Sequence, residues 1–190
     1  MKSTSSFTGA IFCGGKSRRM GRPKAGIRLT NGFTMIEQVY RAMKNVCEKI
    51  VLVGHGDGVP DSINHLRRIE DHYQNCGPLG GLQALLNSGL DSEYLVAPCD
   101  LCCVSPAVFT FLAAQNSVLP IVLKSKHGLQ PLLGRYPSQI LPVVTKQILD
   151  ERLAMSDLIF AVPATIVQIP EAYEDSIFNA NIEKDLMFQN

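Results

Sequence analysis

A cationic loop near the start of the chain has the residue types that bind phosphate. The stretch "CGGKSRRMGRPK", residues 13–24, carries five cationic side chains and no carboxylate, and the first acidic residue of the chain is Glu37. Adjacent glycines let backbone N–H groups turn toward a phosphate without an intervening side chain. Arg19 can then meet phosphate oxygens as a fork, and Lys24 as a point charge. On charge alone, a solvated basic loop or a nucleic-acid-binding loop explains these residues equally well.

Two common phosphate-binding motifs are excluded by spacing. "GGKS" contains the Gly-Lys-Ser of a P-loop, but Ala10 stands where that motif requires its first glycine. A dinucleotide G-x-G-x-x-G pattern fails as well, because Gly14 and Gly15 are adjacent and Gly21 is too far away. The loop follows "TGAIFC", residues 8–13, which is typical of a buried strand. This position favours a nucleoside triphosphate as the ligand.

Two carboxylates are expected at the ends of later strands. "LRRIED" finishes at Asp71, and "EYLVAPCD" carries Asp100 at its carboxyl end. In sheets built from alternating strands and helices, ligands bind beyond the carboxyl ends of the strands. Asp100 is therefore a candidate ligand for Mg²⁺, which prefers one or two carboxylates together with substrate oxygens. The alternatives are that Asp100 only terminates a strand and that Asp71 is a solvated loop residue.

The pattern of elements predicts the fold class. Thr34 and Glu37 form a capping box ahead of an apolar helical face. Strands alternate with helices, which indicates a mainly parallel, three-layer α/β/α sandwich of Rossmann-like type, in a single domain over residues 1–190. We expect strands at residues 8–13, 49–54, 66–71, 93–100, 119–124 and 129–136, and helices at 34–47, 77–89, from 105 onward, and 138–152.

Composition narrows the class of protein. The chain has 190 residues, 46% of them hydrophobic, and a net charge of +1, so it is not a polyanion binder by overall charge. Seven of the eighteen Lys and Arg residues precede Glu37, which suggests an anion site near the N-terminus. No segment resembles a signal peptide or approaches the ~20 apolar residues of a membrane span. Six cysteines are therefore expected as reduced thiols in the cytoplasm. The "CDLCC" cluster lacks the second pair that a structural zinc site needs.

Several segments together carry a family resemblance. The stretch "FCGGKSRRMGRPKAGIRL" resembles the signature loop of nucleotidyltransferases with a Rossmann-like fold. "IED" followed by "GPLGGL", then "PCD", "GLQPLLGRY" and "NANIEKDL", are similar in order to segments of the molybdenum cofactor guanylyltransferases. The resemblance spans Ala10 to about Leu186, nearly the whole chain.

The resemblance implies an activity and a set of site residues. GTP and molybdopterin-bound molybdenum would give molybdopterin guanine dinucleotide and diphosphate, with Mg²⁺ held by Asp100. Catalytic roles would fall to Arg19, Lys24 and Asp100. Nucleotide binding would involve Phe12, Cys13, Gly14, Gly15, Lys24, Asp71 and Asp100, and acceptor binding would involve Gln130, Asn179 and Asn181. Cofactor-delivery proteins and apo-molybdoenzymes are the implied protein partners, with no nucleic acid and no membrane.

The chemistry can be argued from charge. A terminal phosphate of the acceptor attacks the α-phosphorus of GTP in line, and this nucleophile is already an anion at neutral pH. Catalysis therefore depends on positioning and on fixed positive charge. We expect Lys24→Ala to lower the rate by at least ~100-fold, the scale of removing one preorganised charge contact.

Departures from the family pattern leave alternatives open. Guanine-specific members place an asparagine after the second strand, where this chain reads "VGHGDG"; His55 is the candidate substitute. One alternative is a cytidylyltransferase acting on molybdopterin or on another small phosphorylated acceptor. A second is a nucleotide-binding module without catalysis, although the chain keeps both Lys24 and Asp100. A nucleic-acid binder is disfavoured, because no aromatic residues are interleaved with the arginines.

Overall fold

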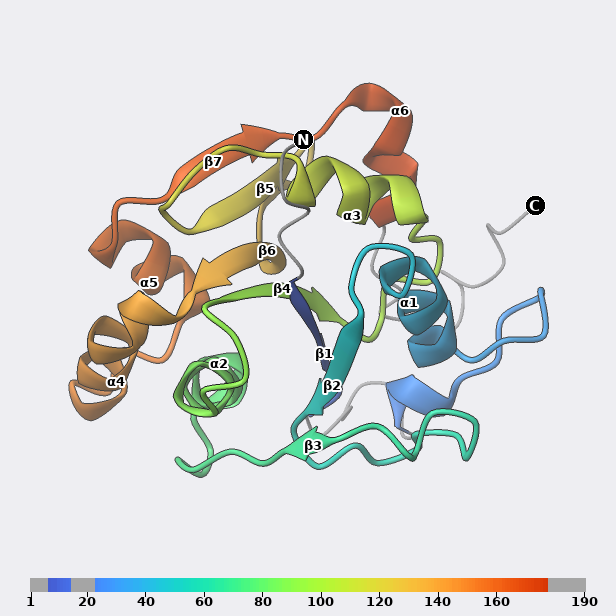
Figure 1. Ribbon diagram of the computed structural model, residues 1–190, viewed down its shortest axis with the longest axis horizontal. Coiled ribbons are helices and arrows are strands. Elements are labelled where there is room, and N and C mark those ends of the chain that lie inside the picture. Colours follow the sequence, from blue (N-terminus) through green and yellow to red (C-terminus); the bar gives the residue numbers. More distant parts are fainter. Residues whose placement is uncertain (1–6, 15–22, 178–190) are drawn as a thin grey trace.

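The protein is built around one twisted seven-stranded sheet (Figure 1). The computed structural model describes residues 7–14 and 23–177. The strand order is β3-β2-β1-β4-β6-β5-β7, and β6 is antiparallel to both its neighbours while the other pairs are parallel. The strands are β1 (Thr8–Phe12), β2 (Lys49–Val53), β3 (Arg68–Ile69), β4 (Glu93–Pro98), β5 (Ile121–Ser125), β6 (Gly128–Pro137) and β7 (Thr165–Gln168).

Helices cover both faces of the sheet, which confirms the expected three-layer α/β architecture. On one face α1 and α3 pack together, and on the other lie α2, α4 and α5 (Figure 1). The α-helices are α1 (Met35–Met43), α2 (Gly77–Asn87), α3 (Pro106–Ala113), α4 (Leu141–Leu149), α5 (Met155–Ala161) and α6 (Glu171–Glu174). Short 3-10 helices are η1 (Lys24–Gly26), η2 (Ser138–Ile140) and η3 (Asp175–Ile177).

Local sequence signals explain several of these boundaries. The capping box before α1 is confirmed: Thr34 Oγ1 accepts from the Glu37 backbone N–H, and the Glu37 carboxylate accepts from the Thr34 N–H at 2.7 Å. Pro106 opens α3, where its missing N–H costs nothing. Gly89, just beyond α2, ends the helix by adopting a φ of +64°.

The centre of the sheet is buried in the core. All five residues of β1 are buried, and β1 pairs in parallel with β2 on one side and with β4 on the other. Phe12 is in register with Val53 and with Pro98, so these three strands end at the same edge. The loops that follow them are therefore brought together by the topology of the sheet.

Some expected boundaries were wrong. The strand expected over residues 66–71 is only the two residues of β3, and Asp71 lies in the loop beyond it. The helix expected over 138–152 begins as η2 and becomes α-helical only from Leu141 to Leu149. The sequence patterns also missed α5, β7 and α6, which are all short.

Within the part of the chain that the structure describes, every helix falls short of the length and apolar character needed to cross a membrane.

Candidate active site

An ion pair joins two predicted site residues that are 76 positions apart. The Lys24 ammonium donates to Asp100 Oδ2 at 2.8 Å, and the side chains are only 20% and 17% exposed. Lys24 opens η1, and Asp100 follows the end of β4. The two charges therefore meet at the edge where the parallel strands end. A fixed cation and a carboxylate side by side can bind a phosphate oxygen and a divalent metal, respectively.

The end of β1 supplies backbone close to this pair. The Phe12 carbonyl accepts from the Cys99 N–H at 3.0 Å, and the Cys13 N–H donates to the Val53 carbonyl at 2.9 Å. Burial raises the pKa of the Cys13 thiol to about 11, so this cysteine is a neutral packing group at neutral pH. Gly14, the next residue, is exposed at the same edge.

The loop after β2 makes a close contact with Gly14, just beyond the end of β1. A Cβ on Gly54 would lie 2.7 Å from the Gly14 Cα and 2.8 Å from its nitrogen, and Gly54 has a φ of +97°. A Cβ on Gly26 would likewise lie 2.7 Å from the Gly58 carbonyl oxygen. The loop after β2 therefore supports both ends of the cationic loop. Sequence reasoning did not assign this role to "VGHGDG", although its three alternating glycines were the available signal.

Asp71 lies beside the N-terminal turn of α2. Its Oδ1 is buried and receives no hydrogen bond from the described residues. Burial raises the pKa of the Asp71 carboxyl above its ordinary value, and the nearby His55 and His72 partly oppose that shift. A Cβ on Gly81 would lie 3.4 Å from Oδ1, so the glycine gives the carboxylate its space. An acceptor oxygen without a donor is suited to N–H groups of a ligand.

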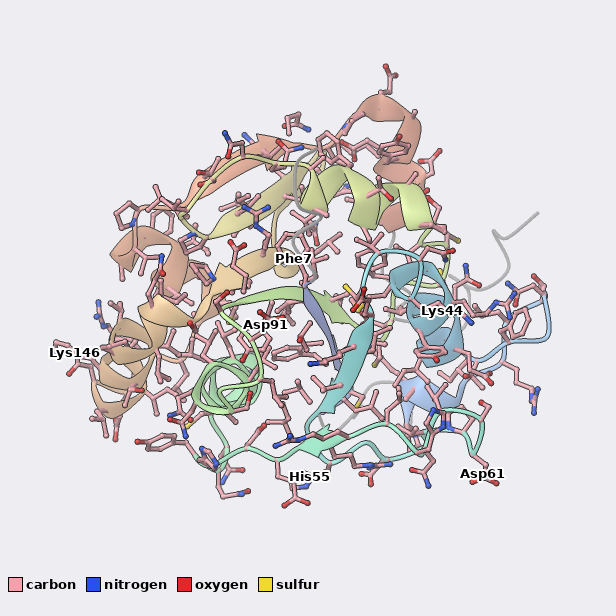
Figure 2. All side chains as sticks on the ribbon, viewed as in Figure 1. Phe7, Lys44, His55, Asp61, Asp91 and Lys146 are labelled. Carbon is pink, nitrogen blue, oxygen red and sulfur yellow. The ribbon has the colours of Figure 1, made fainter. Side chains whose placement is uncertain are left out.

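His55, the candidate substitute for a base-contacting asparagine, is exposed and lies next to β3 (Figure 2). Its carbonyl accepts a hydrogen bond from the Arg68 guanidinium, and Gly54 donates its N–H to the Ile69 carbonyl at 2.9 Å. The loop after β2 is thus tied to β3, the strand that leads to Asp71. These bonds bring His55 and Asp71 to neighbouring positions at one edge of the sheet.

Gln130 lies further along the same edge. It belongs to the first half of β6, beyond the residues that pair with β4, and β6 runs in the opposite direction to β4. Its amide donates to Ser125 Oγ at 3.1 Å, so the side chain is held by β5. The remaining predicted site residues lie outside the described residues: Gly15, Arg19, Asn179 and Asn181.

The Asp100 carboxylate suits a metal ion that takes its remaining ligands from the substrate. Among residues 7–14 and 23–177, no three His, Cys, Asp or Glu side chains are grouped so that they could hold a metal ion by themselves. A single carboxylate at a mostly buried edge matches Mg²⁺, which takes its other ligands from phosphates and water. In the "CDLCC" segment, Cys102 packs in an apolar cluster with Ile27, Leu29 and Met35.

The chain is similar in sequence to curated proteins from several bacteria. A curated relative from Bacillus cytotoxicus, named probable molybdenum cofactor guanylyltransferase, is 32% identical over 81% of this chain and 80% of its own. A relative with the same name from Flavobacterium johnsoniae is 30% identical over 93% of this chain and 92% of its own.

A solved structure and a family model also match this chain. A crystal structure titled molybdopterin-guanine dinucleotide biosynthesis protein A, from Archaeoglobus fulgidus, superposes with a TM-score of 0.77 at 21% identity, covering 95% of both chains, and so shares the fold. The family model described as "MobA-like NTP transferase domain" matches residues 9–175. The chain therefore belongs to the MobA-like NTP transferase family.

Proposed function

We propose that this protein transfers GMP from GTP to the terminal phosphate of molybdenum-bound molybdopterin, giving molybdopterin guanine dinucleotide and diphosphate. The names of the relatives support this activity. The observation that carries the proposal is the Lys24–Asp100 ion pair of 2.8 Å at the edge where β1, β2 and β4 end. We further propose that residues 1–190 act as one nucleotidyltransferase domain.

Lys24 is the residue that stabilises the negative charge of the leaving diphosphate. An oxygen of the acceptor phosphate forms a bond to the α-phosphorus of GTP, and the bond from that phosphorus to the bridging oxygen of diphosphate breaks. Negative charge moves onto the diphosphate, where a preorganised ammonium stabilises it. The acceptor is already ionised, so no side chain has to remove its proton. Lys24 is mostly buried, which makes its charge more effective than one in bulk water.

Asp100 is the proposed ligand of a divalent metal ion, which we take to be Mg²⁺. When bound, the ion supplies Lewis-acid neutralisation of phosphate oxygens. Asp100 also holds the Lys24 ammonium in place, because the two side chains share a hydrogen bond. The same pair therefore orients both positive charges that a triphosphate requires.

The nucleotide would be held by groups at the same edge. Backbone at Phe12, Cys13, Gly14 and Gly15 is proposed to contact the nucleotide, with Asp71 accepting N–H groups of the base. Guanine presents an N1–H and an exocyclic amine to such a carboxylate. The Asp71 oxygen without a hydrogen-bond partner supports this role. Arg19 is proposed to assist Lys24, and Gln130, Asn179 and Asn181 to contact the acceptor.

The test is a panel of magnesium nucleoside triphosphates incubated with molybdenum-loaded molybdopterin. Diphosphate release and the dinucleotide formed are both scored, for the wild type and for Lys24→Ala. We expect turnover with GTP alone and a loss of at least ~100-fold in the variant. Turnover with CTP alone would favour the cytidylyltransferase alternative. Binding of GTP without diphosphate release would favour a non-catalytic module.

A further inference from the structure

Two adjacent cysteines, Cys102 and Cys103, follow shortly after Asp100 in the sequence. The proposed function assigns no role to their thiols. The Sγ atoms of Cys102 and Cys103 lie 3.6 Å apart. Cys102 is buried and Cys103 is half-buried. All six cysteines of the chain are among the described residues, and none of them is in a disulfide. Sulfur atoms of two thiols at this separation need to move by less than 2 Å to form a bond of about 2.05 Å.

The vicinal thiol pair, Cys102 and Cys103, lies between Asp100 and the segment that follows Lys24. It occupies the centre of a turn closed by the Val104 N–H donating to the Leu101 carbonyl at 3.4 Å. Asp100 is the residue directly before this turn.

On its other side, Cys102 packs against the segment that continues from Lys24. Cys102 belongs to one apolar cluster with Ile27, Leu29 and Met35, and Cys103 packs against this cluster. A change in the shape of the turn would therefore act on the positions of both Lys24 and Asp100.

Three other cysteines are poor candidates for the same chemistry. Burial raises the pKa of the Cys13 thiol to about 11 and that of Cys47 to about 12. Burial, with the neighbouring Asp100 carboxylate, also raises the pKa of Cys99. Thiols react as thiolates, so these three are disfavoured as nucleophiles. Cys103 combines partial exposure with a second sulfur within reach.

We propose that the vicinal thiol pair is a site of reversible two-electron oxidation by hydroperoxides, and that its oxidation disables the catalytic ion pair. The Cys103 thiolate, having lost its proton to solvent, attacks one oxygen of the hydroperoxide, and the O–O bond breaks. Cys103 becomes a sulfenic acid, and the alkoxide or hydroxide that leaves takes up a proton from solvent as alcohol or water. Cys102 then attacks that sulfur, the S–S bond forms, and hydroxide leaves to take up the Cys102 proton as water.

Ring closure must change the backbone of the turn. Adjacent Cα atoms are about 3.8 Å apart across a trans peptide, below the usual range of about 4.4–6.8 Å for disulfides. The bond is therefore strained, and a dithiol reductant should open it readily. The strain is relieved only by moving the peptide between the two cysteines, which lies two residues from Asp100. This makes the oxidation reversible and couples it to the site.

Thiol counting tests the modification without reference to activity. The protein is treated with hydrogen peroxide, denatured, alkylated with N-ethylmaleimide and weighed by mass spectrometry. Wild type should fall from six reactive thiols to four, and dithiothreitol should restore six. Cys103→Ser should keep all of its five thiols. Cys99→Ser should still lose two, which distinguishes the vicinal pair from pairing with Cys99. Unchanged thiol numbers in the wild type would overturn the proposal.

Coupling to the site is tested by the reactivity of Lys24. Acetic anhydride modifies amines, and the ion pair protects Lys24, so oxidation should raise its acetylation rate severalfold in wild type and leave Cys103→Ser unaffected. An unchanged rate in the oxidised wild type would overturn the coupling.

The effect on GMP transfer rests on the proposed function: a fall of at least about tenfold is expected, because small misplacements of catalytic groups cost up to ~100-fold. Inactivity of the fully reduced enzyme would count against the proposed function only, since thiol counts and acetylation remain readable.

Discussion

At the scale of single residues, the site contains a carboxyl group, that of Asp71, whose ionised form is disfavoured by burial. Asp71 has an oxygen that is buried without a hydrogen bond from the described residues, and burial raises the pKa of its carboxyl. A group whose pKa is raised by folding binds protons more tightly in the folded state. Its ionisation therefore lowers stability as the pH rises from the unfolded pKa, about 3.9, through the folded one. Such an arrangement is expected where a ligand, rather than the protein, supplies the missing donors.

Asp71→Asn should accordingly stabilise the free protein near neutral pH. The variant removes the ionisation penalty, so its melting temperature should exceed that of the wild type at pH 7, and the gap should shrink as the pH falls toward 4. GTP affinity should fall in the same variant, because an amide accepts hydrogen bonds from guanine less strongly than a carboxylate.

Thermal unfolding from pH 4 to 7 and GTP titration measure the two effects. Asp61→Asn is the matched control, because Asp61 is exposed on the loop after β2, away from the site (Figure 2). A gap for Asp71→Asn that does not depend on pH would contradict the assignment.

At the scale of elements, the approach of the loop after β2 to the end of β1 determines how the cationic loop begins. Gly54→Ala would place a Cβ against two backbone atoms of Gly14 that cannot rotate away. Gly32→Ala provides the control, since Gly32 has a similar φ of +85° but no atom within 4 Å of the added Cβ. Both variants incur left-handed backbone strain of roughly 1–2 kcal/mol.

Gly54→Ala should cost about 1–3 kcal/mol beyond the control, which is the range of overpacking, and should also weaken GTP binding. Urea denaturation of the two variants measures the difference. Equal losses of stability would show that the contact between the loops carries no energy.

Sequence patterns predicted the elements whose signals are local. The strand before the cationic loop, the capping box at Thr34 and the stop at Gly89 follow from burial, side-chain bonds and backbone freedom. The convergence of Lys24 and Asp100 at one edge followed from the rule that parallel strands end together. Their direct ion pair did not, because it depends on how η1 folds back against the end of β4.

The elements that were missed lack such signals. Helix α5 begins at Met155, its N-cap residue Ala154 provides no side-chain cap, and β7 is a four-residue edge strand with only partial burial. Their positions are set by packing against β5 and β6, contacts between residues far apart in sequence. The contact between Gly54 and Gly14 is of the same kind. Glycines in sequence show that a close approach is permitted, and only the fold shows which segment approaches.

At the scale of the whole molecule, charge is arranged for one small polyanion and not for an extended one. The net charge is +1, and the cations concentrate before Glu37 while eight acids follow from Asp150 to the end. Near the far edge of the sheet, Lys126 pairs with Asp175 at 3.4 Å and its N–H donates to Glu174, so positive charge there is neutralised. A nucleic acid would need a continuous basic track, which this distribution does not provide.

Magnesium GTP should therefore stabilise the fold, and duplex DNA should not. At a hundred times its Kd, a ligand adds about 2.7 kcal/mol to the free energy of unfolding, or roughly 5 to 10 °C in Tm for a chain of this size. Because its contacts lie at a mostly buried pair, the shift should change little between 50 and 200 mM salt, whereas phosphate-backbone binding would weaken ~10³-fold or more. Thermal melts with each ligand at both salt concentrations, repeated with Lys24→Ala, measure this directly. A shift produced equally by DNA and abolished at high salt would mean that the cationic loop serves nucleic acid, and the ion pair at the end of β4 would then be only a structural link between η1 and the sheet.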